Sequence, residues 1–292
     1  MRERKREARL RTLGRVISIA CSLLAALSYG TGDFFGGIAA RRAAALAVTF
    51  IANVSSVLPL MLLVLLRPGQ ATFSDMLFGV LAGGCAGTAL VLLYGALARG
   101  TMGIVSPISA VVAALVPLVV GLALGEHLRT LQAIGIVAAL IAIALISADG
   151  GVDARAATRT EVRSAVLCGV FFGLVYVFLG FARSQAGLWP LAAERGGAVI
   201  ALGLVGVLTR APLVFGGRSL WVSCLAGFFD LGAQALYLIA RQAGTLSIAA
   251  VLTSLYPVST FFLARVVLGE RLRRLQIIGV LIALGAIALI VA

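Results

Sequence analysis

The segment GEHLRTLQAIG at residues 125–135 returns almost unchanged as GERLRRLQIIG at residues 269–279. Both copies follow the pattern G-E-x-L-R-x-L-Q-x-I-G, and chance repetition of so long a pattern is improbable. Weaker matches at similar separations accompany it: Gly100-Thr101 with Gly244-Thr245, and Cys21 and Tyr29 with Cys168 and Tyr176. The chain is therefore predicted to consist of two related halves.

The composition indicates whether these halves fold in water or in a membrane. Hydrophobic residues make up 61% of the 292 residues, and the mean hydropathy is +1.11, whereas soluble domains are about half apolar. Charged residues, only 12% of the chain, gather at the ends of long apolar runs. No water-soluble fold could hide so much apolar surface, so the chain is predicted to lie in a bilayer.

Apolar runs of about 20 residues, the length that crosses the hydrocarbon core as a helix, divide the sequence into about ten candidate spans. They are Val16–Ala39, Ala44–Leu66, Phe73–Ala98, Gly103–Leu124, Leu131–Ala148, Val162–Ala182, Leu188–Leu208, Leu220–Ala240, Leu246–Leu268 and Leu275–Ala292. The predicted fold class is an all-α membrane protein.

The spans group into two repeats around a polar centre. We expect a basic cytoplasmic tail at residues 1–15, a first repeat at 16–148, a linker at 149–161 and a second repeat at 162–292. With about five spans in each repeat, the second repeat must enter the membrane from the opposite side. Two inverted five-helix repeats are a recurring transporter architecture.

Several classes of function are excluded or disfavoured. The net charge of +13 is spread along the chain without aromatic platforms, which argues against nucleic-acid binding. Lys5 is the only lysine, so no ATP-binding P-loop exists, and His127 is the only histidine. The four cysteines all fall within apolar runs. We expect no catalytic residues, no metal site and no cofactor.

The paired G-E segments, the run Tyr29-Gly30-Thr31-Gly32-Asp33-Phe34 and Arg195 resemble the drug/metabolite transporter superfamily, specifically its EamA-type branch with two tandem domains. The resemblance covers essentially the whole chain. It implies ten spans in inverted repeats, both termini in the cytoplasm, and secondary transport, often export, of amino acids and related metabolites. In this chain Phe50 occupies the first-half position that corresponds to Arg195. No acidic residue lies deep in the first span, so the four-helix multidrug members are a poor mechanistic template.

The charges flanking the spans give conflicting signals about orientation. The basic head, which includes Arg2, Arg4 and Lys5, favours a cytoplasmic N-terminus. The later loop arginines, among them Arg41 and Arg210, would then lie outside, against the usual bias. The basic N-terminal segment and the family resemblance agree with each other, and on these grounds we predict a multi-pass inner-membrane protein with both termini in the cytoplasm.

Ionisable groups inside spans are costly, by roughly 3 kcal/mol at a helix centre, so each is a candidate functional residue. Asp230 is the clearest, because Gln234 and Tyr237 lie on the same helical face and should meet a central pathway with it. Glu194 and Arg195 either line that pathway or form a buried structural pair, and the sequence does not separate these alternatives.

Weaker candidates come from polar groups in other spans. Asp33 shares a face with Tyr29 and could lie at a cavity mouth, although we favour the water interface. Asn53 and Ser56 could receive substrate, although bonds between helices are favoured. Further candidates for the pathway are Tyr176, Ser254 and Tyr256.

Prolines and glycines indicate how the helices bend and pack. Pro107, Pro117 and Pro257 each remove a backbone donor and are predicted as hinges. Gly79, Gly83 and Gly87 repeat at a spacing that lets another helix approach closely. In the G-E motif, we expect the glycine to end one helix and the glutamate to lie by the first turn of the next.

These observations favour a secondary transporter, and an exporter, of small metabolites such as amino acids that works by alternating access around a central polar cavity. The alternative is a flippase for lipid-linked sugars or polyprenyl phosphates, and an intramembrane enzyme is less favoured. We expect a small-molecule substrate, the lipid bilayer and protons as partners, and a monomer.

Overall fold

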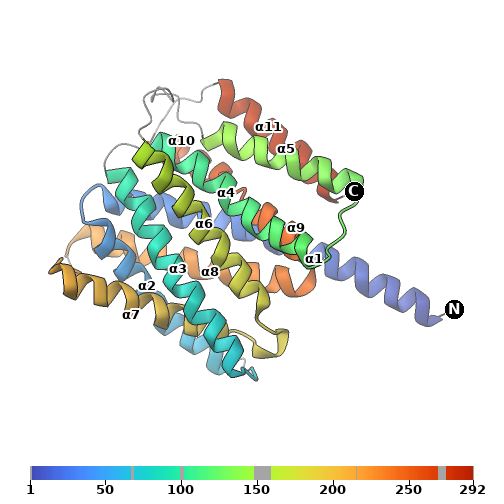
Figure 1. Cartoon of the computed structure of the whole chain (residues 1–292), viewed down its shortest axis with the longest axis horizontal. Helices are drawn as coiled ribbons and strands as arrows, with labels where there is room; N and C mark the ends of the chain where they lie inside the picture. The colour runs from blue at the N-terminus through green and yellow to red at the C-terminus, as the bar shows by residue number, and fades with distance from the viewer. Residues whose placement is uncertain are drawn as a thin grey trace.

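In a computed structural model of the chain, residues 2–66, 69–98, 102–147, 159–214, 216–268 and 274–291 are described (Figure 1). Every regular element in this part of the chain is a helix. The elements are α1 (Arg2–Ala40), α2 (Ala45–Leu66), α3 (Phe73–Ala98), α4 (Met102–Ala123), α5 (Thr130–Ser147), α6 (Arg159–Phe181), the 3-10 turn η2 (Ser184–Ala186), α7 (Trp189–Thr209), α8 (Arg218–Ala243), α9 (Leu246–Thr253), α10 (Pro257–Leu268) and α11 (Arg274–Val291).

The predicted all-helical membrane class is confirmed. Six helices in the described ranges are long and apolar enough to cross a membrane, and four shorter apolar helices account for the other predicted spans. Large apolar side chains face outward, among them Leu58, Phe73 and Trp221, which are 80%, 83% and 73% exposed. Such surfaces are stable when lipid covers them.

Two boundaries differ from the predicted ones. The predicted span Leu246–Leu268 is broken into α9 and α10 by a turn at residues 254–256, directly before Pro257. Proline has no N–H and its ring clashes with the preceding turn, which explains a break at this point. Residues 2–15, which were predicted as a tail, form the first part of α1, and Figure 1 shows this helix extending beyond the bundle at the N-terminus.

The other predicted hinges lie in an uninterrupted helix. α4 continues through Pro107 and Pro117, so neither proline breaks it, and a hinge role for them stays a prediction. The Pro107 side chain is outside the described side chains. Residues 148–158, which include most of the predicted linker, and the second G-E motif with Glu270 lie outside the described residues.

The predicted close approach at the glycine series is confirmed between α3 and α7. A Cβ atom at Gly79 would lie 2.3 Å from the Pro190 carbonyl oxygen, and one at Gly83 would lie 2.1 Å from the Glu194 carbonyl oxygen. Real Cβ atoms do not come so close. Because Gly79 and Gly83 have no side chains, α7 packs directly against the backbone of α3, and this contact positions the backbone of Glu194.

The first G-E motif differs in part from its prediction. Gly125 ends α4 with a φ of 86°, as expected for a helix-terminating glycine. Glu126, however, does not cap the next helix. It accepts hydrogen bonds from the backbone N–H groups of Leu246 (2.6 Å) and Ser247 (3.0 Å), in the first turn of α9. The carboxylate thus satisfies orphan donors of a helix in the other half of the chain. At α5, Gln132 instead accepts from the Arg129 amide at 3.0 Å.

Several contacts assign helix ends to the same side of the bundle. Gly14, in the N-terminal half of α1, lies against the Ala243 carbonyl at the end of α8. Arg241, also at the end of α8, shares a polar pocket with Arg183, just after the end of α6. The start of α9 follows α8 directly and meets the end of α4 through Glu126. α1 and α9 therefore begin on the side of the bundle on which α4, α6 and α8 end.

Substitution of alanine at Gly83 should lower stability because the new methyl group meets the α7 backbone. We expect a loss of about 1–3 kcal/mol, measured as a lower melting temperature in detergent. Gly84 is the matched control: a Cβ atom there has nothing within 4 Å, so Gly84→Ala should be neutral or stabilising by up to about 1 kcal/mol. Equal effects at the two positions would contradict the packing.

Loss of the Glu126 carboxylate should also lower the melting temperature. Glu126→Ala leaves two amides of α9 without their acceptors, which should cost about 1–2 kcal/mol. Glu126→Gln keeps one acceptor oxygen and should fall between the native protein and the alanine variant. A melting temperature unchanged in Glu126→Ala would show that this cap contributes nothing.

Candidate functional site

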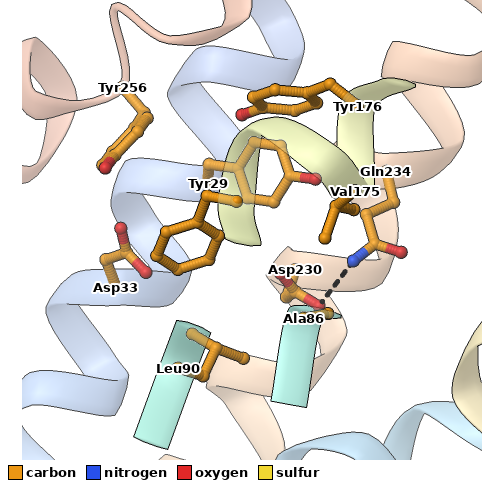
Figure 2. Close-up of a pocket in the computed structure, with 10 residues that line it drawn as sticks. Tyr29, Asp33, Ala86, Leu90, Val175, Tyr176, Asp230, Gln234 and Tyr256 are labelled. Carbon is orange, nitrogen blue, oxygen red and sulfur yellow. Dashed lines mark hydrogen bonds between the residues drawn. The ribbon is translucent and has the colours of Figure 1, made fainter. Parts of the chain in front are cut away.

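A narrow pocket lies where α1, α3, α6 and α8 meet the break between α9 and α10 (Figure 2). Its lining comes from both halves of the chain: Tyr29 and Asp33 from α1, Ala86 and Leu90 from α3, Phe172, Val175 and Tyr176 from α6, Asp230 and Gln234 from α8, and Tyr256 from the break. The volume of the cavity is about 20 Å³. That is room for roughly one water, so a metabolite can enter only if the lining moves.

Tyrosine rings form one wall of the pocket. The ring centroid of Tyr29 lies 6.2 Å from that of Tyr176, edge to face at 76°, and 6.4 Å from that of Tyr256. Tyr237 supports this wall from behind: its ring packs on Tyr176 with centroids 4.8 Å apart, and its hydroxyl donates to the Tyr176 carbonyl at 2.7 Å. The wall is therefore held in place by a fully buried side chain.

Behind the pocket, a buried arginine links three helices. The guanidinium of Arg195, on α7, donates to Asp230 Oδ2 at 2.5 Å and to Asn53 Oδ1, on α2, at 2.9 Å. Its third nitrogen, Nε, lies 3.3 Å from Glu194 Oε2. The Arg195 and Glu194 side chains are 2% and 0% exposed, while Asp230 is 19% exposed and reaches the pocket. Asp230 is therefore the part of this ion network that a ligand could contact.

Gln234 joins the pocket to the network. Its amide nitrogen lies 3.4 Å from both Glu194 Oε1 and Asp230 Oδ2, at the long limit of a hydrogen bond. Its amide oxygen is buried, and no group in the described part of the chain donates to it. A buried acceptor without a donor is costly, so this amide is available to a ligand or a water.

Asp33 lies in the wall of the pocket, whereas the sequence favoured the water interface for it. Within the described ranges, no side chain forms a hydrogen bond or an ion pair with its carboxylate. The sequence contains a sign of this placement: Tyr29, a predicted pathway residue, lies four residues before Asp33, so the two share one face of α1.

The predicted site residues divide into three groups. Tyr29, Tyr176, Asp230, Gln234 and Tyr256 line the pocket. Tyr237, which was expected to face the pathway, lies behind Tyr176, and Glu194, Arg195 and Asn53 lie behind Asp230. Of the two alternatives for Glu194 and Arg195, the geometry is that of a buried pair.

The last group does not line the pocket. Ser56 donates to the carbonyl of Asn53 in its own helix at 2.7 Å, and Ser254 is buried in the break before Pro257. Sequence reasoning missed Ala86, Leu90, Phe172 and Val175, because apolar lining carries no polar signal. Among the described residues, no group of three or more His, Cys, Asp or Glu side chains could hold a metal ion.

Comparison with known proteins gives a family and a fold. The profile of the EamA-like transporter family matches residues 16–148 and 159–292. A crystal structure with 17% sequence identity superposes with a TM-score of 0.70, covering 96% of this chain and 95% of the other. No curated protein sequence matches this chain.

Removal of the Arg195 charge should destabilise the protein strongly. Arg195→Gln leaves Glu194 and Asp230 without their cation in a buried site, a change that typically costs about 3–5 kcal/mol. Arg218→Gln, at the exposed start of α8, serves as the matched control and should change stability by less than about 0.5 kcal/mol. Comparable melting temperatures for the two variants would contradict a structural ion network.

Proposed function

Because the chain belongs to the EamA-like transporter family, we propose that it is a secondary transporter that carries small metabolites through the pocket between its halves. Membership makes it a membrane transporter of the drug/metabolite superfamily, and this family is one of transporters, not of enzymes. The observation that carries the proposal is the pocket itself, a narrow cavity that is lined by residues from both halves, includes two carboxylates and an amide, and is too small for a metabolite in this conformation. A carrier must have such a state between its two open ones.

Alternating access follows if the halves are inverted repeats of five helices. The directions of equivalent helices support this: α1 begins on the side of the bundle where α6 ends, and α9 begins on the side where α4 ends. Tyr29 and Tyr176, which occupy matching positions in the two halves, meet at the pocket. Rocking of one half against the other about this contact would open the pocket to each side in turn.

The remaining features of the proposal extend the sequence prediction. The substrates are small metabolites such as amino acids, the direction is export, and protons on the pocket carboxylates provide the coupling. The protein acts as a monomer in the inner membrane with both termini in the cytoplasm.

A flippase is the weaker alternative. The large lateral groove between α1, α10 and α11 is lined by apolar side chains apart from Thr31 and Ser259, both of which already bond to backbone carbonyls. A charged lipid headgroup would find no polar path in this lining, whereas the central pocket offers two carboxylates and an amide.

The purified protein in liposomes should move a small metabolite by saturable flux without ATP. Asp230→Asn keeps the size of the side chain but removes its charge, and should lower the rate at least about tenfold and flatten its dependence on pH. Gln242→Glu, an exposed change near the end of α8, should leave the rate unaltered. A folded Asp230→Asn variant with native rate and pH profile would leave Asp230 a structural role only.

A further inference from the structure

We propose that the pocket selects an organic cation, such as a protonated or quaternary amine, over zwitterionic and anionic metabolites, with Asp33 and the tyrosine wall as its binding groups. This inference rests on the proposed transport function and names the substrate class of the same pocket. It follows from the charge, the aromatic lining and the unpaired acceptors.

The charged groups that face the pocket are both acidic. Asp33 and Asp230 belong to the lining, whereas Arg195 lies behind Asp230 and is not part of it. Two nitrogens of Arg195 donate to Asp230 and Asn53, and the third, Nε, lies 3.3 Å from Glu194 Oε2, which is not part of the pocket lining. A substrate carboxylate would therefore meet two acids and no available guanidinium, which disfavours zwitterions and anions.

The charges in and behind the pocket do not balance. Glu194, Asp230 and Asp33 bring three carboxylates to this region against the one guanidinium of Arg195, which already bonds to Asp230 and Asn53 and lies beside Glu194. In a medium of low dielectric constant an uncompensated carboxylate is unfavourable, which favours a cationic ligand beside Asp33. A cationic ligand beside Asp33 neutralises the carboxylate that has no partner in the described part of the chain.

Aromatic rings complete the site for a cation. Tyr29, Tyr176 and Tyr256 come from three different elements and surround the same cavity, joined by Phe172. Figure 2 shows the hydroxyl of Tyr256 and the carboxylate of Asp33 directed toward each other on one side of the Tyr29 ring. The negative faces of tyrosine rings attract alkylammonium groups, and several rings around one acid are typical of sites for organic cations.

The hydrogen-bonding groups of the pocket also favour a cationic ligand. The pocket offers several hydrogen-bond acceptors: the Asp33 carboxylate, the Asp230 carboxylate and the amide oxygen of Gln234, which has no donor among the described residues. A ligand that supplies N–H donors or a diffuse positive charge complements this set. A ligand that brings only further acceptors would leave the acceptors of the pocket without donors.

Ligand-induced shifts in melting temperature test the charge preference directly. We would use two sets of probes that differ in charge but little in shape. One contains choline, the zwitterion betaine and the neutral alcohol 3,3-dimethylbutan-1-ol. The other contains isopentylamine, leucine and 3-methylbutan-1-ol, at pH 7. In each set the cation should stabilise the protein at concentrations on the order of tenfold lower than its neutral or zwitterionic analogue.

Matched variants locate the effect. Asp33→Asn should abolish the shift caused by the cations while the variant stays folded. Asp75→Asn makes the same chemical change at the start of α3, where Asp75 pairs with Arg183 outside the pocket, and should retain the full cation-induced shift above its own baseline. Should Asp33→Asn fail to fold, Tyr256→Leu provides a second test and should reduce the shift.

The outcomes separate this inference from the transport function. Equal or stronger stabilisation by betaine or leucine overturns the cation preference, and so does a full cation shift in Asp33→Asn. If no cation in either set shifts the melting temperature, the inference is also wrong. Saturable liposome flux of leucine without flux of choline would overturn it while leaving the proposed transport function intact.

Discussion

A buried arginine is the constraint on which the centre of this protein depends. In a bilayer the guanidinium of Arg195 cannot turn to water, so every nitrogen needs a partner from the protein. Those partners are Asn53 on α2, Glu194 on α7 and Asp230 on α8. The arginine therefore joins three helices and fixes the direction of the one carboxylate, Asp230, that also reaches the pocket.

The packing of the neighbouring helices holds this ion network in place. The bare surface of α3 at Gly83 lets the Glu194 backbone approach to a distance that no side chain would permit. The tyrosine wall is built nearly symmetrically from matching positions, Tyr29 and Tyr176. The charges are not symmetric, because Phe50 stands in the first half where Arg195 stands in the second. The ion pairs behind the pocket therefore come from the second half alone, although each half contributes one carboxylate, Asp33 or Asp230, to the pocket lining.

Much of this could be predicted from the sequence, because local rules govern it. The apolar runs locate nearly every helix to within a few residues, since the bilayer demands length and hydrophobicity. The four-residue spacing of Asp230 and Gln234 places both on the pocket face. What depends on distant packing could not be predicted: the capping of α9 by Glu126 across the halves, and the position of Tyr237 behind Tyr176, are set by how separate helices meet. The sequence does not establish that Asp33 lines the pocket, because its neighbours in space come from the distant helices α6 and α8.

The central claim, that the pocket is the transport path and opens to each side in turn, is tested most directly by thiol accessibility. In a variant without the native cysteines, Ala86→Cys places a small reactive group in the lining, and Leu58→Cys places one on the outer surface. A membrane-impermeant thiol reagent should label position 86 from either side of the membrane, and a transported substrate should change both rates; position 58 should not respond to substrate. Labelling of position 86 from one side only, at a rate that substrate does not change, would contradict alternating access.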